Sequence, residues 1–208
     1  MLANLAAFAL TALFISMVPG QGVAMVLRQA IVSGPTVARV SILGNSTGLI
    51  IWSAASALGL SAIFGVSPLA FEILRWSGVA YLAFIAAQTL WSLRSRNSTF
   101  DLDGSATTSL KSAYRVGLFT NLTNAKAMIF ALALLPQYVP KGFNLTLGIM
   151  IFGLLWTTIS MSWYLGLVAV INKSSRWLSQ PLVRRWLTAA SGIGILLLAV
   201  GLALSPRS

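Results

Sequence analysis

Phe119-Thr120-Asn121-Leu122-Thr123-Asn124-Ala125-Lys126 is a short polar stretch inside a long apolar segment. Val116–Leu118 precede it, and the uncharged run Ala127–Leu135 follows it. A lysine at the centre of a membrane helix costs about 2.5–3.5 kcal/mol on insertion scales, so such a residue is a candidate functional group by default. The alternative is that Lys126 lies near an interface and extends its ammonium to lipid phosphates.

The composition indicates a membrane protein with several spans. Of the 208 residues, 57% are hydrophobic and 8% are charged, whereas about a quarter of a soluble domain is charged. The net charge of +11 comes from basic residues between apolar runs, so it indicates membrane orientation rather than nucleic-acid binding. The chain has no cysteine and no histidine, which excludes disulfides, thiolate metal sites and imidazole catalysis. We therefore expect no metal and no other cofactor.

Six mainly apolar segments are long enough to cross a bilayer, which takes about 20 residues. They are Leu2–Ile31, Val40–Phe64, Leu69–Leu93, Gly117–Val139, Phe143–Ile171 and Trp186–Leu204. The sequence thus predicts an all-α polytopic membrane protein, with one transmembrane domain over 1–208. Its first three-helix half is 1–93, a polar cytoplasmic loop is 94–116, and its second three-helix half is 117–208.

The basic residues predict the orientation. Ten of the fourteen fall on one side of the predicted membrane: Arg28, Arg39, Arg94, Arg96, Lys111, Arg115, Lys173, Arg176, Arg184 and Arg185. Three fall on the other side: Arg75, Lys141 and Arg207. By the positive-inside rule the first group faces the cytoplasm, so we expect both termini to be periplasmic.

The two halves have the pattern of an inverted repeat. Each holds three predicted spans, and an odd number makes the second half enter the membrane from the opposite side. The first span of each half is interrupted, by Val18–Gly22 in one and by Asn121–Lys126 in the other. Helix breaks at corresponding positions of two halves are the best sequence pointer to a transporter site. Identity between the halves is poor, so the repeat depends on this pattern alone.

Pro19, Gly20, Gln21 and Gly22 are candidate substrate contacts at the first break. Proline removes a backbone donor and glycine relaxes the chain, so a break would free N–H groups that favour an anion such as a carboxylate. Gln21 adds an amide donor and an acceptor. A harmless proline kink is the alternative, and the second break makes the functional interpretation the better one.

Asn121, Asn124 and Lys126 are the candidates at the second break. Asn121 and Asn124 share a helix face. About nine residues of helix after Gly117, at ~1.5 Å each, place Lys126 ~14 Å deep in a core ~30 Å thick, which is near its centre. A lysine there needs water, an anion or the loss of its proton. We expect a substrate carboxylate to be its intermittent partner, in a site that suits a zwitterion or an anion.

Gly44-Asn45-Ser46-Thr47-Gly48 is a GxxxG pattern in the second span. Such a pattern permits two helices to approach closely, within one chain or between two copies. We favour packing within the chain, and a homodimer stays open. Asn45, on the same helix, is a further candidate substrate contact.

The remaining mid-span residues are less specific. Trp156, Trp163 and Tyr164 fall within the fifth span, where aromatic residues pack more often than they contact ligands, although one could line a pocket. No Asp or Glu lies well inside a predicted span, and Glu72 is near the outer end of the third. Cation and proton translocators usually carry carboxylates within the membrane, so coupling to a proton has no obvious carrier.

Several motifs occur together along roughly residues 1 to 140. They are Val18–Gly20 with Val26–Ala30, Gly44 and Gly48 with Ala57–Leu60, Ser77–Leu82, Asn121–Ala127, and Leu135–Val139. This set resembles the LysE/RhtB family of amino-acid exporters, and the rest of the chain resembles the family only by hydropathy. The resemblance implies a small exporter in the bacterial inner membrane that moves amino acids or related metabolites outward, with proton antiport as the expected drive.

The chain departs from the family pattern in two places. Pro19-Gly20-Gln21 stands where the family usually has Pro-Gly-Pro, with Gly22 where an acid or amide often follows. Asn124-Ala125-Lys126 stands where it usually has Asn-Pro-Lys. These changes bear on the substrate and on proton coupling rather than on the fold.

The leading hypothesis is a secondary exporter of a zwitterionic amino acid, with the bilayer and a small molecule as its partners. A membrane scaffold or regulator without transport activity is the alternative. An enzyme is disfavoured, because intramembrane hydrolysis needs a serine–histidine pair or a pair of acids.

Overall fold

The computed structural model describes residues 2–18, 20–64 and 109–173, together with separate helical residues between 69 and 91 and between 189 and 203. Every element in these described ranges is helical, as predicted. The third and sixth predicted spans, Leu69–Leu93 and Trp186–Leu204, and the predicted loop up to residue 108 lie wholly or mostly outside the described residues. Pro19 also lies outside them.

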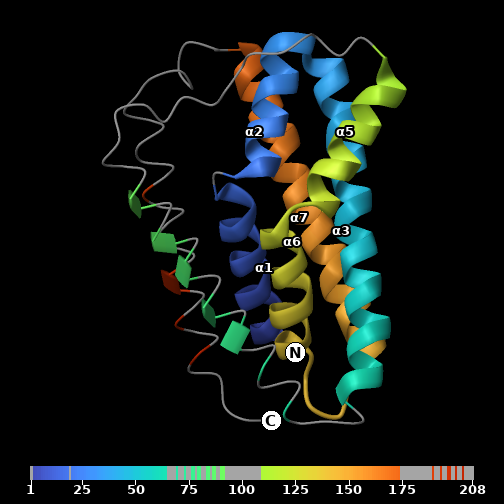
Figure 1. Ribbon diagram of the computed structural model, residues 1–208, viewed down its shortest axis with the longest axis vertical. Coiled ribbons are helices and arrows are strands. Elements are labelled where there is room, and N and C mark those ends of the chain that lie inside the picture. Colours follow the sequence, from blue (N-terminus) through green and yellow to red (C-terminus); the bar gives the residue numbers. More distant parts are fainter. Residues whose placement is uncertain are drawn as a thin grey trace.

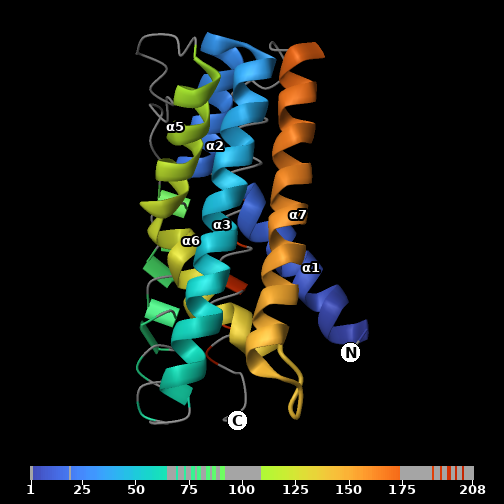
Figure 2. The same ribbon diagram turned by 90° about the vertical axis from the view of Figure 1, so that its right-hand side faces the viewer.

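Two long helices run the full height of the bundle without a break (Figure 2). They are α3, Pro35–Phe64, and α7, Leu145–Lys173. Pro35 suits the first turn of α3, where its missing N–H costs nothing. Asn144 caps α7, because its Oδ1 accepts the Leu147 N–H at 2.9 Å. Both are long and apolar enough to cross a membrane, which confirms the predicted second and fifth spans.

The first predicted span is present as a bent pair of helices. Helix α1, Leu2–Met17, is followed by α2, Gln21–Arg28, and by a π-helical turn, η1, Gln29–Ser33. The two parts are bent by 59° at the break. The π-helical turn ends at Gly34, whose φ of 90° is a conformation that favours glycine.

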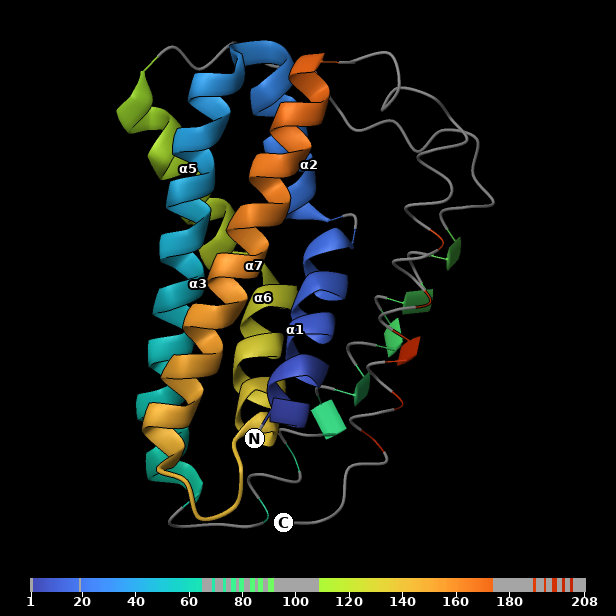
Figure 3. The same ribbon diagram turned by 180° about the vertical axis from the view of Figure 1, so that it is seen from behind.

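The fourth predicted span is bent in the same way, by 56°. Helix α5, Leu110–Leu122, is followed after the break by α6, Ala125–Ile129, and then by the short turns η2, Phe130–Leu134, and η3, Leu135–Tyr138. Figure 3 shows α1 and α2 stacked end to end, and Figure 1 shows α5 and α6 in the same relation. Both predicted breaks are therefore present, and up to four spans occur in the described part of the chain.

Helix α5 begins at Leu110 rather than at the predicted Gly117. Ala113 and Gly117 are buried, whereas Lys111 and Arg115 are exposed. The sequence interpretation assigned this segment to the loop as part of an extended polar stretch, but helical spacing turns its basic residues away from the bundle.

Helices α3 and α5 cross in close contact at Gly44, Gly48 and Gly117, and we call this contact the glycine crossing. A Cβ atom at Gly44 would collide with the backbone of Tyr114, and one at Gly117 would collide with the backbone of Ser41. A Cβ at Gly48 would lie 2.6 Å from that of Asn121. The GxxxG pattern thus packs within the chain, which brings Asn121 against α3.

Two apolar clusters are stacked along the bundle axis. We call the end with Arg28, Arg39, Lys111, Arg115 and Lys173 the basic end, and the end with Lys141 the opposite end. The cluster toward the opposite end centres on Phe8, whose ring lies 4.9 Å from that of Phe152 and 5.0 Å from that of Tyr138. The cluster toward the basic end includes Val26, Ile42, Tyr164 and Val168. The two helix breaks lie between these clusters.

Candidate functional site

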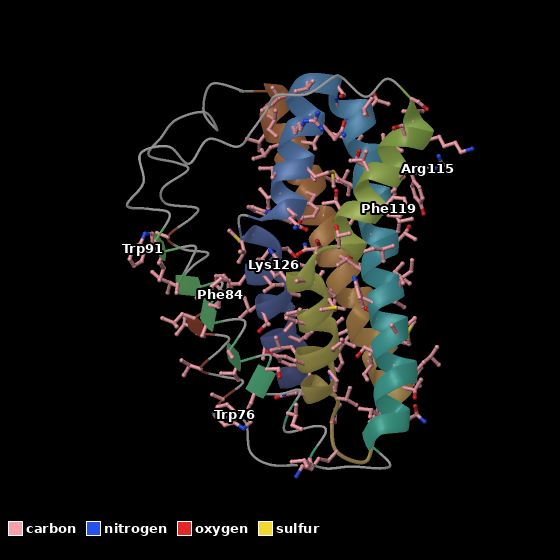
Figure 4. The ribbon with its side chains drawn as sticks, viewed as in Figure 1. Trp76, Phe84, Trp91, Arg115, Phe119 and Lys126 are labelled. Atoms are coloured by element: carbon pink, nitrogen blue, oxygen red, sulfur yellow. The ribbon has the colours of Figure 1, made fainter. Side chains whose placement is uncertain are left out.

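Lys126 connects the two helix breaks. From α6 it reaches α1, where its Nζ donates to the carbonyl oxygens of Ile15 at 3.1 Å and Val18 at 3.2 Å. Figure 4 shows Lys126 near half the height of the bundle, which agrees with the central depth counted from the sequence. A helix carbonyl end carries partial negative charge and favours a cation.

Pro19 explains why the Ile15 carbonyl is available. In a continuous helix this carbonyl would accept the N–H of residue 19, and proline has no N–H. Water, an anion or the loss of its proton was expected to accommodate Lys126, whereas the structure gives its ammonium carbonyl partners from the other half of the chain.

Asn124 fixes the direction of Lys126. Its Oδ1 accepts the Lys126 backbone N–H at 3.1 Å, so it is the N-cap of α6. Gly20 lies beside the ammonium, since a Cβ there would be 3.6 Å from Lys126 Nζ, in ordinary contact. The second break thus aims Lys126 at the first.

A small cavity lies at this junction, with about 20 Å³ open to the centre of a water molecule. That is room for roughly one water. Its lining consists of Ile15, Ser16, Asn45, Leu49, Asn121, Asn124, Lys126, Ala127, Trp156, Ser160 and Tyr164. An amino acid is larger than this space, so its binding requires the walls to separate.

The structure brings most of the predicted contacts together. Asn45, Asn121, Asn124 and Lys126 line the cavity, and Gly20 lies beside the ammonium. Gly22 is buried, and a Cβ there would lie 2.6 Å from the Tyr164 hydroxyl and 3.7 Å from Asn45 Oδ1.

Gln21 is a predicted contact that lies away from the cavity, since its side chain is exposed and is not part of the cavity lining. The first turn of α2 directs Gly22 into the bundle and its neighbour Gln21 out of it. Pro19 cannot be placed, because it lies outside the described residues.

The two asparagine amides are paired across the glycine crossing. Asn121 Nδ2 donates to Asn45 Oδ1 at 3.2 Å, and the Trp52 indole N–H donates to the Asn121 carbonyl at 3.3 Å. Asn121 Oδ1 is buried and has no hydrogen-bond partner. A buried acceptor without a partner is costly, so a donor supplied when the cavity fills would stabilise this site.

Sequence reasoning missed one wall of the cavity. Trp156, Ser160 and Tyr164 of α7 line it, although the two aromatic residues were interpreted mainly as packing and Ser160 was not considered. Their spacing of four residues places all three on one helix face. That spacing, together with the two polar groups in an apolar helix, was the available signal.

The charge of the cavity restricts its ligands. Lys126 is the one residue with a formal charge among the lining residues, and no Asp or Glu occurs in ranges 2–18, 20–64 or 109–173. No group of His, Cys, Asp and Glu that could hold a metal occurs in the part of the chain that the structure describes. The site can offer an ammonium to an anion, and neutral oxygens to a donor.

Discontinuous helices that meet at a central polar cavity are an arrangement of membrane transporters. The comparison with known families agrees: the model of the LysE type translocator family matches residues 13–206. The chain belongs to this family, so it is a membrane translocator and not an enzyme. The match extends well beyond the residues whose motifs carried the resemblance, which ended near residue 140.

Similar proteins come from several bacteria. A homoserine/homoserine lactone efflux protein of Salmonella typhimurium is 31% identical over 89% of each chain. The uncharacterised membrane protein YrhP of Bacillus subtilis is 24% identical over 91% of this chain and 93% of its own. A leucine efflux protein of Enterobacter is 26% identical over 65% of this chain and 64% of its own. No solved structure matches the chain.

Proposed function

We propose that this translocator exports neutral amino acids, or closely related zwitterionic metabolites, across the bacterial inner membrane. The observation that carries the proposal is the ammonium of Lys126, held by carbonyls at the junction of two helix breaks in a cavity without an acid. A carboxylate would complete this site electrostatically. The names of two relatives, a homoserine and a leucine efflux protein, support the substrate class.

The proposed contacts follow from the geometry. Lys126 exchanges its carbonyl partners for the substrate carboxylate, and Asn45, Asn121 and Asn124 line the same space. Gly20 and Gly22 give the substrate access to the α2 end of the first break, where no side chain caps the helix. Pro19 contributes by leaving the Ile15 carbonyl without its helical donor, and Gln21 becomes a contact when the bundle opens.

We infer that transport proceeds by alternating access with proton antiport. The apolar clusters on the two sides of the cavity would open in turn, with the three-helix halves arranged as an inverted repeat. The proton would travel on the Lys126 amine, which together with the Tyr164 phenol is one of the two ionisable groups in the lining. The basic end would face the cytoplasm, with both termini periplasmic and lipid around the bundle.

Export from cells tests the proposal. Overexpression should raise the external concentration of leucine or homoserine in a peptide-fed culture, and an equally abundant Lys126→Ala protein should not. If no amino acid accumulates outside cells that contain the wild-type protein in their membranes, the transport proposal fails and a scaffold or regulatory role takes its place.

A further inference from the structure

The polarity of the cavity changes along the membrane axis, and α3, the α5–α6 pair and α7 show the same change. On α3, which starts at the basic end, Asn45 comes before Leu49. On the α5–α6 pair, which runs the same way, Asn121 and Asn124 come before Ala127. The polar residues of these helices therefore lie toward the basic end.

Helix α7 runs in the opposite direction and reverses the order. Trp156 comes first, followed by Ser160 and Tyr164, which end nearest the basic end. At ~1.5 Å per residue, Trp156 and Tyr164 are ~12 Å apart along the axis. The cavity thus has a polar wall toward the basic end and an apolar wall toward the opposite end.

Cluster membership supports this division independently. Ile15, Leu49, Ala127 and Trp156 all belong to the apolar cluster around Phe8. Trp156 also packs on Phe130, with ring centroids 4.6 Å apart. Tyr164 belongs to the other cluster. Lys126 lies between the two walls, since it falls between Asn124 and Ala127 in the chain.

We propose that these two walls recognise the α-ammonium and the side chain of an amino acid whose carboxylate is bound by Lys126. Oxygens of Asn121, Ser160 and Tyr164 accept the α-ammonium, and Ile15, Leu49 and Trp156 enclose an aliphatic side chain. The substrate class is therefore aliphatic amino acids rather than hydroxylated ones. This inference rests on the proposed function, because it assumes that an amino acid occupies the cavity.

The physical basis is the cost of an unpaired polar group. A hydroxyl on the substrate side chain would lose its water against Ile15, Leu49, Ala127 and Trp156, none of which offers it an acceptor. An analogue with a hydroxyl in place of the ammonium would lack the positive charge and could donate one hydrogen bond rather than three to the polar wall, which is a basis for rejection. The matched probes are norvaline, homoserine, whose hydroxyl replaces the norvaline methyl, and 2-hydroxypentanoate, whose hydroxyl replaces the norvaline ammonium.

Equilibrium binding to the purified full-length protein tests the apolar wall. Norvaline should bind about tenfold more tightly than homoserine. Ile15→Thr, which places a hydroxyl in the apolar wall, should reduce this preference about threefold or more. Ile149→Thr is the matched control, because Ile149 is buried in the same cluster but does not line the cavity, and it should leave the preference unchanged.

The polar wall is tested with the same assay. Norvaline should bind about tenfold more tightly than 2-hydroxypentanoate, and Tyr164→Phe should reduce that difference. Tyr138→Phe is the control, because its hydroxyl pairs with Thr11 at 2.9 Å outside the cavity.

Each other result would overturn the inference. If homoserine binds as tightly as norvaline, the apolar wall does not select against a hydroxylated side chain. If each variant and its control have equal effects, Ile15 and Tyr164 do not form the walls that contact the substrate. Export of an amino acid by cells, combined with no binding of norvaline, would overturn the inference and leave the proposed function intact. Absence of any export would remove the proposed function itself.

Discussion

Replacing Lys126 with methionine removes the ammonium and keeps most of the side-chain stem. Two hydrogen bonds from the charged group, to the Ile15 and Val18 carbonyls, are lost. At about 1.5–3 kcal/mol each, they amount to roughly 3–6 kcal/mol. The variant also escapes the cost of a charge at the bilayer centre, about 2.5–3.5 kcal/mol. The net change should therefore lie between about −0.5 and 3.5 kcal/mol of destabilisation, and the protein should still insert and fold.

Export should respond far more strongly than stability. The loss of one charged contact to a substrate carboxylate weakens binding by about 1.5–3 kcal/mol, or tenfold or more. We therefore expect export at limiting substrate to fall at least about tenfold for Lys126→Met. Lys126→Arg should retain the charge but restore little activity, because the planar guanidinium cannot meet both carbonyls as a compact ammonium does.

The assay measures efflux of labelled leucine from preloaded cells, normalised to the protein in the membrane fraction. Lys141→Met is the matched control, since Lys141 is exposed at the opposite end of the bundle, and it should export normally. Thermal unfolding in detergent measures the stability of each variant relative to the wild type. Wild-type export by a Lys126→Met protein of normal abundance would refute the role assigned to this ammonium.

Three further predictions follow from the packing and the topology. Gly117→Val should abolish folding or cost more than about 3 kcal/mol, because its Cβ meets the α3 backbone; Gly166→Ala, with nothing within 4 Å, should melt as the wild type does. On intact cells, a membrane-impermeant thiol reagent should label Phe143→Cys and not Ser112→Cys; the reverse pattern would invert the orientation. Substrate should protect Asn124→Cys from labelling by a small polar reagent, and protection of a cysteine at exposed Thr123 instead would misplace the site.

The sequence predicted the fold where physical constraints are local. Proline and glycine at Val18–Gly22 and the amides at Asn121–Lys126 mark both breaks, and the structure bends the chain at each. The start of α5 was wrong because the basic residues Lys111 and Arg115 were interpreted as loop, whereas helix periodicity lets them face outward. A count of charges carries no information about the face on which they lie.

The site was predicted less completely, for reasons of distance along the chain. The hydrogen bond from Lys126 to the Ile15 carbonyl joins residues 111 positions apart, and no local pattern specifies such a pair. The α7 wall was missed because Trp156 and Tyr164 are as suitable for packing as for ligand contact. Only the crossing of α3 with α5 and α7 gives these side chains a common cavity.

The two breaks depend on each other, which makes the junction suited to transport. Pro19 leaves a carbonyl that α1 cannot satisfy, and the donor comes from Lys126 in the second half of the chain. Lys126 in turn has no acid within the described ranges, so its charge depends on that carbonyl end. Under the proposed mechanism, a substrate carboxylate that draws the ammonium away from these two carbonyls would also release α1 from α6. Substrate binding would then be coupled to the separation of the two halves, and the substrate would supply the differential interaction energy that a change of conformation requires.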